Sequence, residues 1–488
     1  MAGIWQRVVE TVHTLYEEGK MEAAFRSYKE LVEESRLFIK KHEFRNFKPN
    51  VGVFGENSTG KSTFLNALLG NKDQFKMGFG ETTDRVTALY DQKKPNISGS
   101  RDIVFIKEKY DHLQYMNLFD IPGFGQKFSH KKLQALLGEM DIVFWFIDAS
   151  SGVKAADEEF LNDLSGTDTR VIVIYNKIDA VGELDSFIEA KGEIESEIGK
   201  IQHLFAKKGL SKRFVTAFPF SATKSLVGSV KGEKGVFKAI DRIVENILLY
   251  VVFVESYRSF VEFLVPDDEV FVVDNNSFLR EMNRMADTLV NNLERDLKEE
   301  ISILDSLNPF SGKDEKAGPI VERYERRLQQ EANDLLQSLY DELTEVINDI
   351  SGKLSPYNIF GGNLAVEVPE KLDTLQISID LDELAWNSFT GDSFSEDVAE
   401  VFRREARSEL KYSTVKKVQE FEVLFTDYLL AIKKEAEVFA EKMDKKLEGR
   451  TEKIRNMILH LLLGAIKGSL TEHDQKLVEK ILHIEEKN

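Results

Sequence analysis

Residues 55–62 read Gly55-Glu56-Asn57-Ser58-Thr59-Gly60-Lys61-Ser62, which fits the phosphate-loop pattern G-x-x-x-x-G-K-[ST]. The apolar run 51–54 before this loop is typical of a buried strand, and residues 63–69 after it are typical of a helix. The glycines let successive backbone N–H groups turn toward an anion, and the helix N-terminus adds partial positive charge. The stretch therefore predicts a strand–loop–helix unit that binds a nucleoside triphosphate.

The loop also predicts which side chains meet the phosphates and the metal ion. Lys61 can reach the β- and γ-phosphates, and the Ser62 hydroxyl can ligate Mg²⁺. The expected nucleotide contacts of the loop are Glu56, Asn57, Ser58, Thr59, Gly60, Lys61, Ser62 and Thr63.

Two later segments have the residue types of nucleotide-sensing switches. Thr82 and Thr83 precede a strand-like run, where a threonine suits a mobile segment that closes on Mg²⁺ and the γ-phosphate. Thr83 is the preferred metal ligand, and Thr82 is the alternative. Asp120 begins an Asp-Ile-Pro-Gly stretch after another apolar strand. Its carboxylate can hold a Mg²⁺-bound water, and the amide of Gly123 can sense the γ-phosphate.

The stretch Asn176-Lys177-Ile178-Asp179 predicts which base is bound, because it ends the buried run 171–175. A carboxylate at Asp179 can accept hydrogen bonds from the N1–H and N2–H₂ groups of guanine. Adenine lacks this donor pair and would leave the carboxylate unpaired. Asn176 can tie this loop to the phosphate loop, and the Lys177 stem can lie along the base. The nucleotide pair is therefore expected to be GTP and GDP, with Mg²⁺.

A last motif, which begins at Ser221, follows the strand-like run 214–220. Backbone N–H groups there would meet the guanine O6, so Ser221, Ala222 and Lys224 join the expected contacts. Each motif stands at a strand end, and helical stretches separate the strands. This order predicts an α/β P-loop GTPase head with a doubly wound, mostly parallel sheet and the ligand at the carboxyl ends of its strands.

The rest of the chain predicts long helices, because its apolar residues recur with a period near 3.6. Apolar residues from Leu279 to Leu304 mark one face of a long helix, a second helix opens at Gly318-Pro319, and a third begins near Ser395 as N-cap. We expect an extended all-α bundle or stalk, with an oligomeric coiled coil as the alternative. The predicted domains are N-terminal helices over 1–47 that pack on the head or bundle, a GTPase domain over 48–232, and a helical bundle over 233–488.

Residues 352–395 interrupt the helical pattern and should lie at a tip of the bundle. Two interpretations stay open for them: a membrane or partner contact, and a loop packed on helix ends. The formal charge of −19 weighs against nucleic acid as a partner. The absence of cysteine fits a reducing compartment or indifference to redox chemistry. The N-terminus lacks a signal-peptide profile, which predicts a cytoplasmic protein, with peripheral membrane contact as a further hypothesis.

This arrangement of motifs and helices resembles the dynamin superfamily, especially the bacterial dynamin-like proteins. The resemblance rests on specific motifs in the head and on architecture alone in the helical half. It implies that Asn57 and Ser58 help to organise the transition state, together with Lys61 and Thr83. It also implies slow GTP hydrolysis that accelerates when heads dimerise, self-association through heads and stalk, and membrane remodelling. Phe124 stands where many small GTPases carry a water-positioning glutamine. Two alternatives follow: catalysis is supplied by another group, or it is very weak.

Two functions therefore remain open from the sequence. The first is a mechanochemical GTPase that oligomerises and remodels a membrane. The second is a soluble molecular switch whose helical domain docks a protein partner and whose hydrolysis is slow or negligible.

Overall fold

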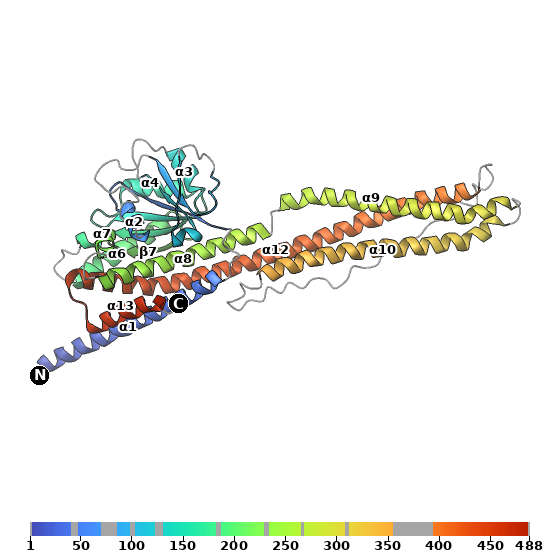
Figure 1. The fold of residues 1–488 in the computed structure, drawn as a ribbon. Coiled ribbons are helices and arrows are strands. Elements are labelled where there is room, and N and C mark those ends of the chain that lie inside the picture. Colours follow the sequence, from blue (N-terminus) through green and yellow to red (C-terminus); the bar gives the residue numbers. More distant parts are fainter. Residues whose placement is uncertain are drawn as a thin grey trace. The chain divides into compact units, whose positions relative to one another are not determined.

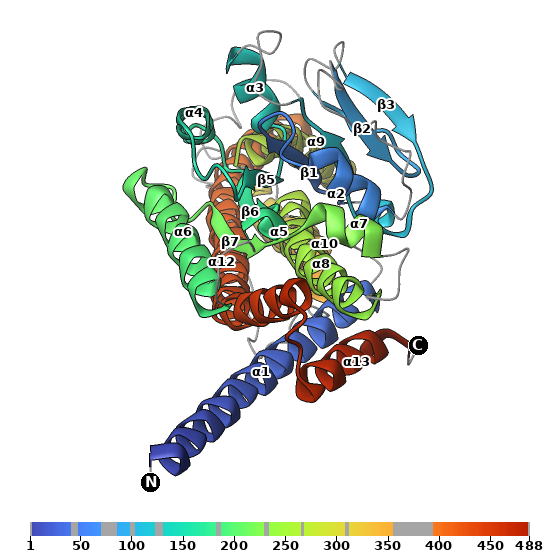
Figure 2. The same ribbon diagram turned by 90° about the vertical axis from the view of Figure 1, so that its left-hand side faces the viewer.

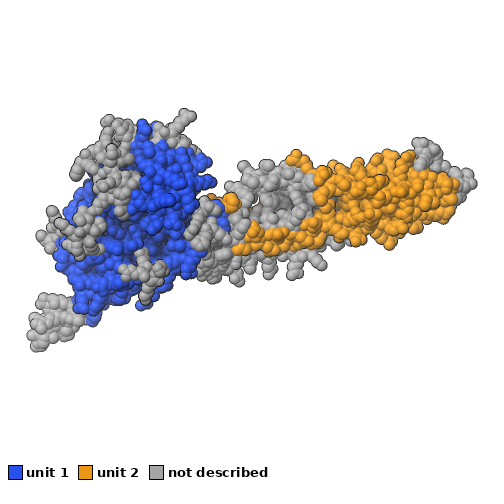
Figure 3. All heavy atoms as spheres, viewed as in Figure 1, with its two compact units in different colours: residues 1–260, 438–488 blue, residues 261–437 orange. Residues whose placement is uncertain are grey.

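The computed structural model describes residues 2–40, 47–69, 85–97, 103–122, 130–181, 187–228, 234–264, 268–307, 312–354 and 394–486. These residues are drawn as a ribbon in Figure 1 and form two compact units, which Figure 3 distinguishes by colour. Unit 1 comprises residues 1–260 and 438–488, and unit 2 comprises residues 261–437. The predicted domain limits at residues 47 and 232 stay predictions, since compactness alone does not define a domain.

Unit 1 is built on a sheet with the strand order β3-β2-β4-β1-β5-β6-β7, seven strands in the described part of the chain. The strands are β1 (Asn50–Gly55), β2 (Val86–Tyr90), β3 (Ile103–Lys107), β4 (Asn117–Asp120), β5 (Ile142–Asp148), β6 (Arg170–Asn176) and β7 (Phe214–Pro219). All neighbouring pairs are parallel except β2 and β4. The predicted mostly parallel sheet is confirmed.

The central strands are continuous apolar runs because both of their faces are covered. Residues 51–55 of β1 and 142–147 of β5 are all buried, as expected for parallel strands between two helical layers. Figure 2 shows helices on both sides of the sheet. They are α2 (Lys61–Leu68), α3 (His130–Leu137), α4 (Ala155–Leu164), α5 (Ile178–Val181), α6 (Phe187–Lys207) and α7 (Ala222–Gly228), with the short η3 (Asp111–Gln114).

Long helices complete unit 1. They are α1 (Ala2–Lys40), α8 (Lys234–Leu264), α13 (Glu472–Glu486) and the C-terminal part of α12 (Phe394–Lys467). Asn246 of α8 donates to the Tyr28 hydroxyl of α1 at 3.1 Å. Arg450 of α12 forms a two-pronged ion pair with Glu34 of α1, at 2.7 and 2.8 Å. The helix at the N-terminus therefore packs against helices from the middle and the end of the chain.

A charged cluster joins the sheet to α8 and α12. Arg170, at the start of β6, donates to both carboxylate oxygens of Asp444 at 2.9 and 3.1 Å. Arg258 of α8 donates to the same carboxylate at 2.6 Å and also pairs with Glu255. Burial raises the pKa of the Glu255 carboxyl to about 7 against the field of the two guanidinium groups. The cluster therefore ties the sheet to two long helices. It lies at the edge of the sheet opposite the carboxyl ends of the strands.

Unit 2 is made of helices alone in its described residues. They are α9 (Asp268–Ile301), η4 (Ser302–Ser306), α10 (Lys313–Leu354) and the N-terminal part of α12. One apolar core runs between them and includes Val290, Leu297, Leu328 and Phe402. Ion pairs at its margin, such as Lys298 with Glu396 at 2.6 Å, connect neighbouring helices. The structure thus shows a large helical region after the GTPase motifs.

Two helix starts differ from the sequence prediction. The second helix was expected to open at Gly318-Pro319, but α10 begins at Lys313 and includes the proline. Burial of Ala317 and Val321 in the core of unit 2 outweighs the cost of a proline near the helix start. Ser395 was expected as an N-cap, yet it lies inside α12, where its hydroxyl donates to the Asp305 carboxylate at 2.7 Å.

The described helices contain none that is long and apolar enough to cross a membrane. Nearly all of the predicted tip, residues 355–393, lies outside the described residues.

Candidate functional site

The phosphate loop leaves β1 at Gly55 and enters α2 at Lys61 through unusual backbone angles. Gly55, Ser58 and Gly60 have φ values of 149°, 63° and 97°, a region that glycine adopts at little cost. A Cβ atom on Gly60 would lie 2.3 Å from the Asn176 side-chain nitrogen, and one on Gly55 would lie 2.5 Å from the Phe146 carbonyl oxygen. Space and backbone angle therefore both require glycine at the two fixed positions of the motif.

Lys61 is buried and turned back onto its own loop. Its ammonium group donates to the carbonyl oxygens of Gly55 and Glu56, both at 2.8 Å. Desolvation lowers its pKa to about 8, although Asp120 and Glu56 oppose the shift. Asn57 and Ser58 are exposed at the loop surface, while Ser62 and Thr63 are half-buried at the start of α2. The loop thus holds a cation inside a curve of backbone, a structure suited to an anion.

Asn176 joins three of the predicted loops. Its side-chain nitrogen donates to the Thr59 carbonyl oxygen at 2.7 Å, and its side-chain oxygen accepts from the Ala222 backbone N–H at 2.9 Å. The residue is almost fully buried. The predicted tie between the base-reading loop and the phosphate loop is therefore present, and the same amide also holds the loop after β7.

The predicted guanine-reading side chains gather at the ends of β6 and β7. The Ser221 hydroxyl donates to Oδ1 of Asp179 at 2.5 Å, and the Lys224 backbone N–H donates to the Ser221 hydroxyl at 3.3 Å. The Asp179 side chain is half-buried. Lys177 has a φ of 66° and donates to the Asp148 carboxylate at 2.6 Å. The site offers a carboxylate beside backbone amides, as recognition of guanine requires.

Asp120 fits the predicted role at the metal ion. Neither of its carboxylate oxygens has a hydrogen-bond partner, although the side chain is buried. Burial raises its pKa to about 6, and the Lys61 ammonium pulls it down. A buried carboxylate needs a counterpart, and within the described residues no donor supplies a hydrogen bond to it. Asp120 and Ser62 would hold Mg²⁺, which would neutralise charge on the phosphates.

Four residues considered at this site lie outside the described residues: Thr82, Thr83, Gly123 and Phe124. Their predicted roles stay predictions.

Two side chains near the site were missed by the motif patterns. Asp148 ends β5 beside Asn176 of β6 and receives Lys177 as well as the Ser150 hydroxyl at 2.6 Å. Lys154, just before α4, pairs with Glu56 of the phosphate loop. The signal for Asp148 was its place at the end of a buried strand, whereas the contact of Lys154 needs the tertiary structure.

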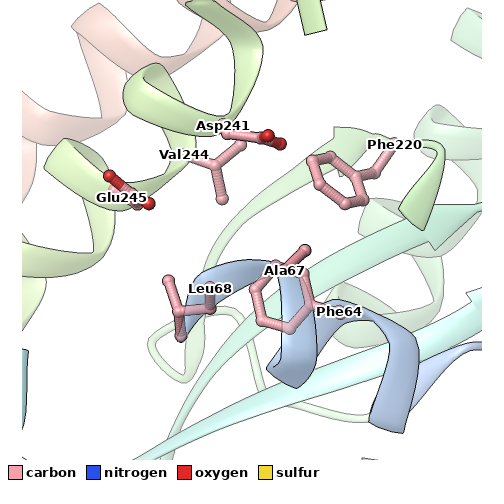
Figure 4. A pocket seen from close by; sticks show the side chains of 7 residues that line it. All are labelled: Phe64, Ala67, Leu68, Phe220, Asp241, Val244 and Glu245. Carbon is pink, nitrogen blue, oxygen red and sulfur yellow. The ribbon is translucent and has the colours of Figure 1, made fainter. Parts of the chain in front are cut away.

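A small pocket lies between α2 and α8, behind the phosphate loop (Figure 4). Phe64 and Leu68 of α2 face Asp241 and Val244 of α8 across it. Asp241 accepts the Ser225 hydroxyl of α7 at 2.5 Å. Desolvation raises the pKa of Asp241 to about 7, against the opposing effects of Ser225 and Arg242. Helix α8 thus lies beside α2 at this pocket and is hydrogen-bonded to α7. Both α2 and α7 directly follow predicted nucleotide-binding loops.

Residues 47–262 match the family described as elongation factor Tu GTP binding domain. The chain contains a GTP-binding P-loop GTPase domain. Its ligand is guanine nucleotide, and Asp120 and Ser62 are the residues that would hold Mg²⁺. Among curated proteins, GTPase Era of Thermotoga maritima is 26% identical over 198 residues, which cover 40% of this chain and 54% of that protein. GTPase Der of Francisella philomiragia is 30% identical over 145 residues, which cover 28% of this chain and 27% of Der.

The chain thus spans about half the length of Era and about a quarter of Der. Among solved structures, a point variant of Aquifex aeolicus Era bound to GDP·AlF₄⁻ is 21% identical, covers 40% of this chain and 66% of that chain, and has a TM-score of 0.26. Another, Era with MgGDPNP and nucleotides 1506–1542 of 16S ribosomal RNA, is 23% identical, covers 39% and 56%, and has a TM-score of 0.25. The family match and the curated relatives establish a GTP-binding GTPase domain, and the resemblance to dynamins stays a proposal.

Substituting Lys61→Ala should abolish binding of guanine nucleotide, with affinity falling at least about 100-fold, because the buried cation expected to hold the phosphates is lost. Titration with a fluorescent GTP analogue measures the change. The control Lys207→Ala removes an exposed lysine from the end of α6 and should bind like the wild type. Unchanged binding by Lys61→Ala would refute the assignment of the site.

The burial of Asp241 leads us to expect that the stability of the protein depends on pH. Its folded pKa of about 7 exceeds the usual 3.8, so the folded protein holds an extra proton between these values and loses stability as pH rises through about 7. The substituted side chain of the Asp241→Asn variant can still accept a hydrogen bond from the Ser225 hydroxyl but carries no charge. The free energy of unfolding of the variant, relative to that of the wild type, should therefore rise by about 1–2 kcal/mol from about pH 5 to about pH 8.

Urea unfolding of both proteins across this pH range measures the difference. Asp334→Asn, which changes an exposed carboxylate of α10, gives the baseline for removing one surface charge. A difference in the free energy of unfolding between Asp241→Asn and the wild type that does not vary with pH would contradict the prediction.

Proposed function

We propose that this protein is a dynamin-like GTPase that couples its nucleotide state to self-association and membrane remodelling. The observation that carries the proposal is the union of the GTPase sheet with long helices in one compact unit. Helices α1, α8, α13 and the end of α12 belong to the same compact unit as the sheet. Helix α8 lines a pocket with α2 and accepts a hydrogen bond from α7. A change at the nucleotide can therefore act directly on a long helix.

The proposed chemistry is hydrolysis of GTP at the site formed by the ends of β1, β4, β6 and β7. Lys61 would hold the phosphates, and Asp179 would select guanine. Ser62 and Asp120, with Thr83, would hold Mg²⁺, which stabilises the charge that develops on the transferred phosphoryl group. Asn57 and Ser58 lie exposed on the loop, where a second head could cover them. Because Phe124 offers no group to position water, a paired head is the proposed source of acceleration.

Several features support a mechanical role over RNA binding. One solved Era structure contains a fragment of 16S ribosomal RNA, which raises RNA as a partner for this chain too. A net charge of −19 opposes the phosphate contacts that dominate such binding. The helices of unit 2 are long, with 34 residues in α9 and 42 in α10. They supply the reach that a stalk needs.

If heads pair across the nucleotide, specific GTPase activity should rise with protein concentration. Phosphate release measured from about 0.1 to about 10 μM protein should show at least a severalfold increase per molecule, since pairing is governed by mass action. The variant Lys61→Ala gives the background. A flat response would favour the soluble switch with slow hydrolysis.

Membrane remodelling requires binding to lipid. The protein should cosediment with anionic liposomes more strongly with a non-hydrolysable GTP analogue than with GDP, because only the triphosphate state favours assembled heads and hence avid binding. Deletion of 352–395 should reduce sedimentation if that segment contacts lipid. Absence of lipid binding in both nucleotide states would overturn the membrane proposal and leave the switch that docks a protein partner.

A further inference from the structure

The phosphate loop of this chain carries an acid where its ligand is an anion. Glu56 directly follows the first glycine of the motif, and its carbonyl oxygen accepts the Lys61 ammonium at 2.8 Å and the Thr59 hydroxyl at 2.8 Å. The backbone of Glu56 is thus part of the curve that faces the phosphates. An uncompensated carboxylate at this position would repel a triphosphate.

The Glu56 carboxylate is paired with one cation from another segment. Lys154, at the end of the loop between β5 and α4, places its ammonium group against Glu56 Oε2. Both side chains are partly exposed, at 44% for Lys154 and 24% for Glu56. Such a pair contributes little to folding stability. We therefore expect it to act on the net charge beside the bound phosphates.

The backbone around Lys154 is held in place from the core. Its N–H donates to Asp157 at 2.9 Å, and the other oxygen of that carboxylate accepts the Trp145 indole N–H at 3.2 Å. Trp145 is fully buried in β5. At the other end of the same loop, the Asp148 carboxylate accepts a hydrogen bond from the ammonium group of Lys177, which belongs to the base-reading loop. The position of Lys154 beside the phosphate loop is therefore built into the fold.

We propose that Lys154 is a positioning residue for nucleotide binding, which neutralises and restrains Glu56 so that the phosphate loop accepts a guanosine triphosphate. This inference rests on the proposed function of the site. Lys154 acts on the ligand through Glu56: removing the lysine exposes the phosphates to a free carboxylate, and removing the carboxylate makes the lysine dispensable. Glu56→Gln alone leaves an additional positive charge beside the loop and should bind at least as tightly as the wild type.

The test is a four-member set of proteins: wild type, Lys154→Met, Glu56→Gln and the double variant. Binding of a fluorescent non-hydrolysable GTP analogue is titrated for each. Lys154→Met should weaken binding about three- to tenfold, the effect of one unscreened charge near the ligand, and the double variant should return to within about twofold of the wild type. Lys154→Arg keeps the charge and should bind like the wild type.

Salt separates a charge effect from a structural one. Between about 0.05 and 0.5 M NaCl, the deficit of Lys154→Met should shrink, because added ions screen an exposed charge. Lys476→Met breaks an exposed lysine–glutamate pair on α13 and is the matched control, expected to leave affinity unchanged. Thermal unfolding of each variant reports whether the fold is kept.

The outcomes are distinct. Wild-type affinity in Lys154→Met, or a double variant as weak as Lys154→Met, would overturn the role of Lys154 while nucleotide binding itself stands. Failure of the wild type to bind the analogue would instead overturn the proposed function.

Discussion

The nucleotide site depends on one buried amide, the side chain of Asn176. It donates to the phosphate loop at Thr59 and accepts from Ala222 after β7, so three loops that lie far apart in the sequence share one anchor. The anchor explains why Gly60 must be glycine, since a Cβ there would overlap the amide nitrogen. Parallel register supplies the rest of the geometry, because it brings the carboxyl ends of β1, β5, β6 and β7 to the same edge.

The same unit connects the sheet to long helices in two places. Behind the site, the Ser225 hydroxyl of α7 donates to Asp241 of α8, and Asp241 lines the pocket between α2 and α8 (Figure 4). At the opposite edge, Arg170 of β6 meets Asp444 of α12 and, through it, Arg258 of α8. Contacts at both ends of the sheet hold α8, so a displacement of the nucleotide loops has a mechanical path to this helix. Packed interfaces of this kind change by discrete rearrangement, which suits a two-state device.

Much of the site could be predicted because its chemistry is local in sequence. Lys61, Asn176 and Asp179 were recognisable from short motifs at strand ends, and the structure places them around one edge. Lys154 could not be found in this way, since its meaning comes from Glu56, a residue 98 positions away. The predicted helix starts were wrong where burial in the tertiary structure outweighed the local sequence preference. Pro319 lies within α10 because its neighbours Ala317 and Val321 belong to the core of unit 2.

The sequence by itself determined the kind of domain, the order of the nucleotide motifs and the helical character of the second half. Glycine positions, strand-end carboxylates and a 3.6-residue period each follow from local backbone chemistry. Only the tertiary structure decided how the chain is divided, since residues 438–488 join residues 1–260 in unit 1. It also decided that the charges of Asp120, Asp241 and Glu255 are desolvated. Burial depends on segments that meet only after folding, so no local pattern contains it.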